Sequence, residues 1–103
     1  MARSPRFPLH LPLQYRTSQS PGWRQGTTEN MSHSGVLFWA ENPLDVNTLV
    51  EIRVILPVPE PDSSHPEIIC QGRVARIVAP TEIQVEPGVA VAIDTYNFLR
   101  PPT

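Results

Sequence analysis

The residues of this chain that are best suited to binding chemistry gather in one stretch, Asn-Met-Ser-His-Ser-Gly at positions 30–35, which runs directly into the apolar segment 36–40. Asn and Ser side chains bond to nearby backbone groups and can leave amide hydrogens directed at an anion, while Gly adopts a left-handed conformation or lets a ligand approach closely. The stretch therefore fits two interpretations, a structural turn at the entrance of a strand or a small anion-accepting surface. Because short motifs match by chance, the spacing alone favours the structural turn.

The other polar residues do not have the spacing of a catalytic or metal site. His10, His33 and His65 lie far apart, and no Cys or carboxylate cluster accompanies them. Ser32 and His33 are neighbours, but adjacent residues in a turn rarely adopt nucleophile–base geometry, and no acidic residue that would orient the histidine is implied. The sequence also lacks a Gly-rich phosphate loop that opens a helix. It therefore predicts a protein that is not an enzyme and that uses no metal and no cofactor.

The segments that must position the polar stretch alternate apolar and polar residues, which is typical of half-buried β-strands. The alternation is clearest in residues 49–56, is present in 7–16, and continues in a long segment, 67–79, where Gly72 predicts a bulge. Further strands are expected at residues 23–29, 36–40, 83–85 and 89–94, with a short closing turn at 96–99. Turn residues separate the segments, and none of them has the apolar spacing of an amphipathic helix.

These elements predict an all-β protein with six or seven short antiparallel strands, arranged as a barrel or a sandwich. A closed sheet would have no exposed edges. With 103 residues, of which 40% are hydrophobic, the chain has the size and composition of one small domain. Within this single domain of residues 1–103, we expect a flexible arm at 1–6, the barrel at 7–98 and a tail at 99–103.

Composition and charge narrow the classes of partner. A net charge of −2 argues against general DNA or RNA binding, which needs a basic surface. The single cysteine, Cys70, lies in an apolar segment and is expected to be a buried hydrophobe, with a reactive thiol as the alternative. Residues 1–20 lack the apolar core of a signal peptide, and no segment has the length of a membrane span. The sequence therefore predicts a cytoplasmic protein without membrane insertion.

The Asn-x-Ser-x-x-Gly pattern of residues 30–35, with Arg6 upstream, resembles the PilZ domain, the bacterial receptor module for the second messenger cyclic di-GMP. That family has an Arg-x-x-x-Arg arm, followed by Asp/Asn-x-Ser-x-x-Gly on a small six-stranded antiparallel barrel. The second motif is matched in full, and the resemblance covers roughly residues 5–98. The arm departs from the pattern, because Ala2 stands four residues before Arg6 and the nearest upstream arginine, Arg3, is one position too close.

The resemblance implies a ligand with two guanines and two phosphates, which requires cationic forks, donors for guanine O6 and N7, and planar groups for stacking. The ligand-binding residues that it implies are Arg3, Arg6, Asn30, Ser32 and Gly35. Arg6 takes the role of the second arm arginine, and Arg3 would stand in for the first. No spacing singles out any of the arginines beyond the arm.

Two functional hypotheses follow. In the first, cyclic di-GMP orders the arm, changes the surface around residues 30–35 and so regulates an effector protein. In the second, the chain is a degenerate PilZ module that binds no nucleotide and serves as a protein–protein interaction domain, through the Trp39 region or the proline-rich loop 57–66. The missing arginine at position 2 leaves both hypotheses open.

Overall fold

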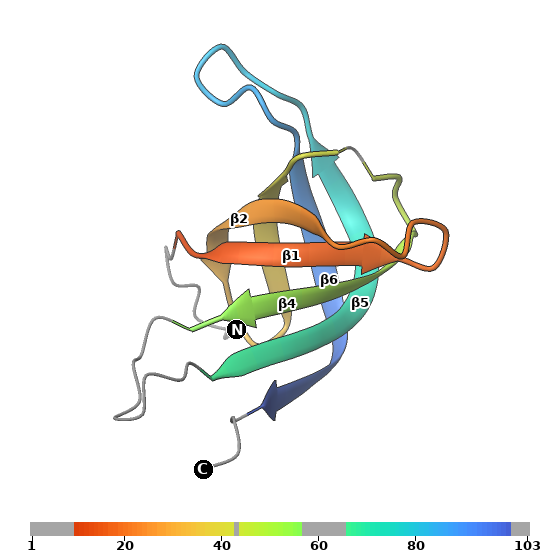
Figure 1. Cartoon of the computed structure of the whole chain (residues 1–103). Helices are drawn as coiled ribbons and strands as arrows, with labels where there is room; N and C mark the ends of the chain where they lie inside the picture. Colours follow the sequence, from red (N-terminus) through yellow and green to blue (C-terminus); the bar gives the residue numbers. More distant parts are fainter. Residues whose placement is uncertain (1–9, 43, 57–65, 100–103) are drawn as a thin grey trace, which may run out of the picture.

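A computed structural model describes residues 10–42, 44–56 and 66–99. Six strands form one antiparallel sheet that closes into a barrel, in the order β1-β2-β3-β6-β5-β4 (Figure 1). Their bounds are β1 Pro12–Thr17, β2 Arg24–Met31, β3 Gly35–Ala40, β4 Leu49–Ile55, β5 Glu67–Val78 and β6 Gly88–Leu99. The described residues contain no helix. The all-β class and the antiparallel barrel are thereby confirmed.

The barrel interior is filled by the side chains that the alternating pattern assigns to one face. In β4, the expected apolar positions Val50, Ile52 and Val54 are all buried, as strict alternation requires. Tyr15 of β1 and Phe38 of β3 are the largest fully buried side chains, and their ring centroids lie 5.2 Å apart. The buried apolar set consists of Leu11, Leu13, Tyr15, Val36, Phe38, Ala40, Val50, Ile52, Val54, Cys70, Val74, Val89 and Val91.

Irregularities in strand pairing interrupt the alternation at three places. The register shifts between Thr28 and Asn30 in the β2–β3 pair. It shifts again between Gln71 and Gly72, and between Val74 and Arg76, in the β5–β6 pair. The expected bulge at Gly72 is therefore wrong in its strand: Gln71 stands opposite Thr95 and Gly72 opposite Ile93, so the extra residue is Asp94 of β6. A Cβ at Gly72 would lie 2.2 Å from the Ala92 carbonyl oxygen, so the close approach of β5 and β6 requires glycine there.

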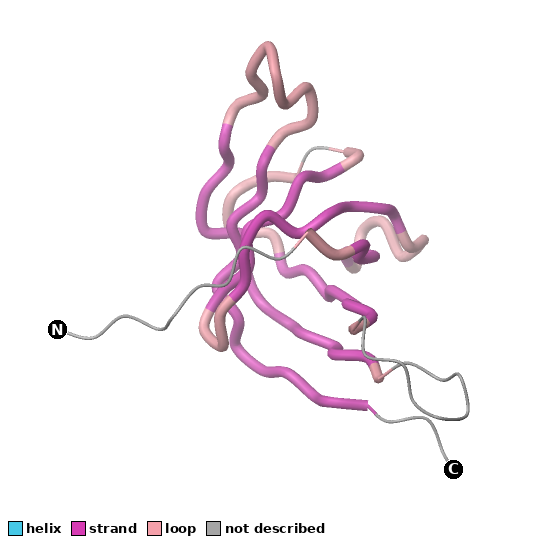
Figure 2. The backbone as a smooth tube through the Cα atoms, turned by 90° about the vertical axis from the view of Figure 1, so that its left-hand side faces the viewer, coloured by secondary structure: helices cyan, strands magenta, loops and turns pink. Residues whose placement is uncertain are grey.

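Two expected elements are wrong. Residues 83–85 form no strand but belong to the β5–β6 connection, where Ile83 is 97% and Val85 is 76% exposed, so no partner strand covers them. Residues 96–99 are not a turn, because they extend β6 and pair with Glu67–Cys70 of β5. The expected arm 1–6 and most of the loop 57–66 lie outside the described residues. Figures 1 and 2 both show the β5–β6 connection projecting beyond the body of the barrel.

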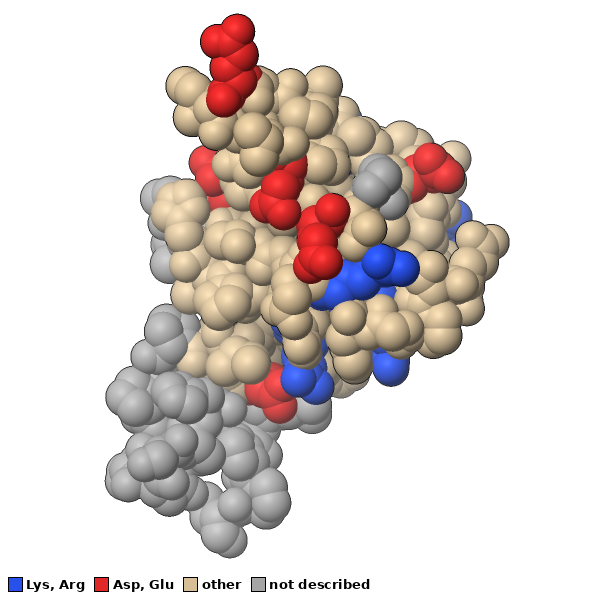
Figure 3. All heavy atoms as spheres, turned by 45° about the horizontal axis from the view of Figure 1, so that its top comes forward, with Lys and Arg blue, Asp and Glu red and all other residues tan. Residues whose placement is uncertain are grey.

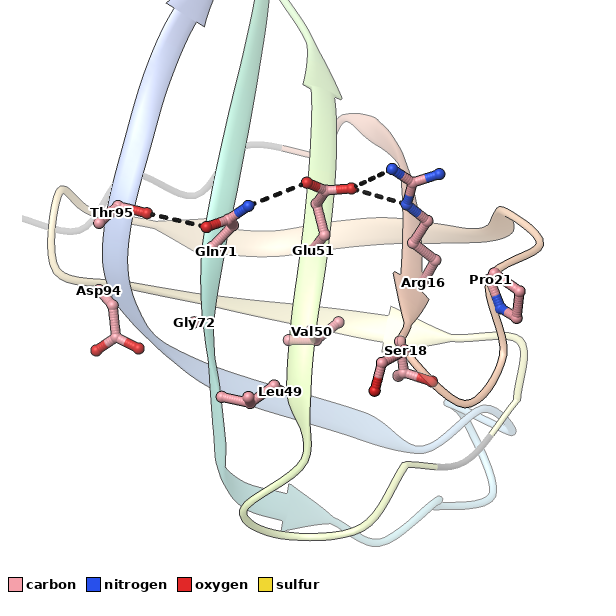
Figure 4. A pocket seen from close by; sticks show the side chains of 11 residues that line it. Arg16, Ser18, Pro21, Leu49, Val50, Glu51, Gln71, Gly72, Asp94 and Thr95 are labelled. Atoms are coloured by element: carbon pink, nitrogen blue, oxygen red, sulfur yellow. Dashed lines mark hydrogen bonds and ion pairs between the residues drawn. The ribbon is translucent and has the colours of Figure 1, made fainter.

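A polar ladder crosses the outer face of four strands (Figure 4). It consists of Arg16, Glu51, Gln71 and Thr95, which stand directly opposite one another in β1, β4, β5 and β6. Arg16 Nε donates to Glu51 Oε1 at 2.7 Å, and Gln71 Nε2 donates to Glu51 Oε2 at 3.2 Å. Thr95 Oγ1 completes the ladder with a 3.5 Å bond to Gln71 Oε1. Such directly opposed pairs are the unit of sheet stabilisation.

Candidate functional site

The polar Asn-Met-Ser-His-Ser-Gly stretch of residues 30–35 is only partly a turn. Asn30 and Met31 are the last residues of β2, and Gly35 is the first of β3, so the turn itself is residues 32–34. Ser32 N donates to the Gly35 carbonyl oxygen at 2.8 Å, and Ser34 N approaches Ser32 Oγ at 3.3 Å. The earlier interpretation of residues 30–35 as a single turn was too wide, because the ladder with β3 continues through Met31.

The bulge in β2 decides which way the polar side chains of this stretch point. After the register shift, Asn30 stands opposite Leu37, and Met31 stands opposite the core residue Val36. Opposed residues share a face of the sheet, so Met31 packs against the core and Asn30 lies on the outer face. Ser32 is only 7% exposed. The Asn and the Ser of the motif therefore lie on different sides of the barrel wall.

Asn30 opens onto a depression of about 400 Å³ on the outer face of the barrel. Its lining comes from the motif stretch and from three strands, and consists of Asn30, Ser34, Gly35, Val36, Leu37, Ala75, Arg76, Ala90, Val91 and Ala92. Glycine and alanine make up much of the lining, which leaves the surface hollow where larger side chains would fill it. Arg76 is the single charged residue that lines this depression among those the structure describes, and no spacing in the sequence singles it out from the other arginines.

The chain enters β1 beside the motif. Leu11 N donates to Thr28 Oγ1 at 2.7 Å, and Thr28 N donates to the Leu11 carbonyl oxygen at 2.9 Å. One residue earlier, His10 Nδ1 lies 3.6 Å from Glu29 Oε2. The first described residues are therefore fixed next to β2, immediately before Asn30. Arg3 and Arg6 lie outside the described residues.

An apolar cavity of about 270 Å³ lies on the inner side of the same turn. It is lined by Leu11, Met31, Ser32, His33, Leu56, Ile68, Cys70, Ile93 and Tyr96. Burial raises the pKa of the Cys70 thiol to about 11, which keeps it protonated at neutral pH. Cys70 is thus the expected buried hydrophobe. Ser32 faces this cavity, whereas Asn30 and Gly35 line the outer depression.

Trp39, which the interaction hypothesis singled out, is half-buried on the outer face of β3. Its indole Nε1 donates to Glu29 Oε2 at 3.1 Å, and its ring lies close over Gly88 of β6. The ring is therefore held in place by β2 and β6. Within the described ranges, no group of three His, Cys, Asp or Glu side chains is placed to hold a metal ion.

The surface charge is not uniform. Figure 3 shows Asp and Glu side chains around the end of the barrel from which the β5–β6 connection projects, while arginines lie nearer the middle.

A separate depression of about 460 Å³ lies beside the polar ladder, between Leu49, Gly72 and Asp94 (Figure 4). It contains none of the residues implied by the family resemblance. In the part of the chain that is described, no helix has the length and apolarity needed to cross a membrane.

A family model for the PilZ domain matches residues 2–97, which is nearly the whole chain. No curated protein and no solved structure matches.

Proposed function

Because the chain belongs to the PilZ domain family, we propose that it is a cyclic di-GMP receptor that regulates an effector protein, acting as an adaptor and not as an enzyme. The observation that carries the proposal is the outer depression, in which Asn30 and Gly35 of the motif lie with Ser34 and Arg76. Its position beside the entry of the chain into β1 lets one ligand contact both halves of the family signature.

The chemistry of the depression suits a guanine nucleotide. Gly35, Ala90 and Ala92 offer an apolar surface on which a flat base can lie. The Asn30 amide can both donate to and accept from a base edge, and arginine guanidinium groups bind phosphate oxygens in bidentate fashion. Asn30 and Gly35 keep the ligand-contacting roles that the family implies for the motif, whereas Ser32 faces the inner cavity and supports the site through its contacts with Ser34.

The arm arginines are within reach of the site. Arg6 precedes His10 by four residues, and four extended residues span at most about 14 Å. Since His10 is fixed beside Glu29, Arg6 can extend to a ligand placed against Asn30. Arg3, three residues further away, can reach the same ligand along a different path, which is how we propose that the shifted arm still functions.

The test is calorimetric titration of the full chain with cyclic di-GMP, with Arg6→Ala and Asn30→Ala as variants. We expect micromolar or tighter binding by the wild type and a loss of at least about tenfold in each variant, because each removes a charge-assisted or buried hydrogen bond. The matched controls are Arg73→Ala and Gln25→Ala, which change exposed residues of β5 and β2 outside the depression. No heat and no thermal shift at high ligand excess would contradict the proposal.

The protein-interaction hypothesis is also supported by a specific observation, at a place that differs from the two expected. The β5–β6 connection exposes Ile83 and Val85 to solvent. Within this connection, Thr81 N donates to the Gln84 carbonyl oxygen at 2.7 Å and closes the turn from Thr81 to Gln84. A preorganised apolar tip suits contact with a protein. Absence of nucleotide binding would leave this function as the better candidate, and under the receptor proposal the same tip is a candidate effector contact. The effector itself and the cytoplasmic location stay predictions.

A further inference from the structure

We propose that Arg76 is a ligand-contacting residue of this site, whose guanidinium binds the O6 and N7 edge of a guanine and compensates for the arginine that the arm lacks at position 2. The inference rests on the proposed function and assigns to it a residue that neither the motif nor the arm contains.

A bulge places Arg76 on the outer face. Val74 is buried and Ile77 packs against the core, although they are three residues apart and strict alternation would put them on opposite faces. The register shift resolves this, because Val74 stands opposite Val91 and Arg76 stands opposite Ala90, with Ala75 as the extra residue. Ala75 and Arg76 are consequently both exposed. Bulges often re-aim a side chain next to a functional site.

Among the described arginines, Arg76 is also the one that makes no ion pair or hydrogen bond with the described part of the protein. The structure describes five arginines, and four of them are engaged by acceptors on the protein: Arg16 by Glu51, Arg24 by Asn42, Arg53 by Glu67 and Arg73 by Asn47. Arg76 has no hydrogen-bond or ion-pair partner among the described residues. An exposed guanidinium that faces a depression and has no acceptor on its own protein is available to a ligand.

The surroundings favour a base over a phosphate as the group that Arg76 binds. Ala75, Ala90 and Ala92 give the depression small apolar walls, which suit the face of a ring and not a charged tetrahedral group. Arginine matches the two acceptors of the guanine edge in bidentate fashion, and adenine presents an amino donor in place of O6. Arg76 would therefore add affinity for guanine and discriminate against adenine.

The experiment titrates the full chain with cyclic di-GMP and with cyclic di-AMP, using the wild type, Arg76→Ala, Arg76→Lys and Arg73→Ala. Arg73 is the matched control, because it is an exposed arginine of the same strand that does not line the depression. We expect Arg76→Ala to raise the Kd for cyclic di-GMP by at least about tenfold and Arg73→Ala to change it by less than about twofold. Arg76→Lys should recover only part of the loss, because lysine keeps the charge without the planar fork.

Titration with cyclic di-AMP distinguishes a contact with the guanine edge from a contact with a phosphate. We expect the preference of the wild type for cyclic di-GMP over cyclic di-AMP to shrink in Arg76→Ala. If the wild type binds cyclic di-GMP and the Kd values of Arg76→Ala and Arg73→Ala for this ligand are equal, the inference is overturned and the proposed function stands. An equal loss for both dinucleotides would show a phosphate contact and overturn the guanine assignment. No binding by the wild type would contradict the proposed function and, with it, the inference.

Discussion

Ser32 and Gly35 are joined by a backbone hydrogen bond across the turn, in which Ser32 N donates to the Gly35 carbonyl oxygen at 2.8 Å. The Ser32 hydroxyl lies 3.3 Å from Ser34 N and 3.4 Å from the same Gly35 oxygen, and the residue is almost fully buried. In addition, Ile93 N donates to the Ser34 carbonyl oxygen at 3.0 Å, which ties the turn to β6. Ser32 thus holds the shape of the turn that carries Ser34 to the outer depression.

Ser32→Ala should loosen this turn. The substitution removes the hydroxyl that meets Ser34 N, and we expect a loss of about 1 kcal/mol in the free energy of unfolding, typical of one side-chain hydrogen bond. Amide hydrogen exchange of Ser34 should become faster, while that of a core strand such as β4 stays unchanged at short times. Ser18→Ala, in the exposed β1–β2 connection, is the control. Equal exchange of Ser34 in wild type and variant would contradict this role.

The polar ladder should contribute to acid sensitivity. The pKa of Glu51 is lowered chiefly by the hydrogen bond from Gln71; burial opposes this, and the hydrogen bond and charge of Arg16 lower the pKa further. A carboxyl group whose pKa is depressed in the folded state stabilises the fold above its unfolded pKa, and this contribution is lost as the pH falls through the folded value. We expect Glu51→Gln to cost about 1 kcal/mol at neutral pH and less at about pH 3, because the unfolded chain takes up the proton at a higher pH than the folded protein does.

Urea unfolding at the two pH values measures this difference. Glu82→Gln removes a carboxylate from the exposed β5–β6 connection and serves as the control, which should behave as the wild type does. A cost for Glu51→Gln that is the same at both pH values would mean that the ladder acts by packing and not by charge.

Cys70 should be inert in the folded protein. Burial raises its pKa to about 11, and only the thiolate reacts with disulfide reagents. At about pH 8 we expect native Cys70 to react with a coloured aromatic disulfide at least about two orders of magnitude more slowly than the same thiol in urea. The unfolded chain is its own control. Rapid labelling of the native protein would restore the alternative of a reactive thiol.

Gly72→Ala should be strongly destabilising. The added methyl group would meet the Ala92 carbonyl oxygen at 2.2 Å and Val91 Cγ1 at 2.8 Å, so β5 and β6 would have to separate at the bulge. We expect a loss of at least about 2 kcal/mol in the free energy of unfolding. Gly22→Ala is a matched control, because a Cβ at Gly22 would have no neighbour within 4 Å. Equal midpoints of thermal unfolding for the two variants would contradict the steric argument.

The strands were predictable where one face is buried along their whole length. In β4, burial imposes a period of two on the side chains, and the sequence shows it directly at Val50, Ile52 and Val54. The irregular pairing near Gly72 was predictable for a related reason, since glycine inside a strand signals a bulge or close backbone approach, but the extra residue lies on β6 and not on β5. These features depend on local sequence, which is why they could be found without coordinates.

Features that depend on a distant partner were not predictable. Ile83 and Val85 have the composition of a strand but no strand beside them, and residues 96–99 have the polarity of a turn but pair with β5. Arg76 was indistinguishable from the other arginines in the sequence, because its direction depends on the Ala75 bulge and its availability depends on the acceptors that engage the others. The motif residues Asn30 and Gly35 could be named from the sequence. It could not be predicted that Ser32 faces the inner cavity while they line the outer depression.

The ladder of Arg16, Glu51, Gln71 and Thr95 also has a consequence for how the barrel assembles. Each member comes from a different strand, and each meets its neighbour only when the residues stand directly opposite. A slip of one residue between β4 and β5 would set Glu51 against Cys70 or Gly72 and turn the partners to opposite faces. Displacement of β4 or β5 against both of its neighbours would break two of the ladder's contacts together, so the ladder favours the correct register among β1, β4, β5 and β6.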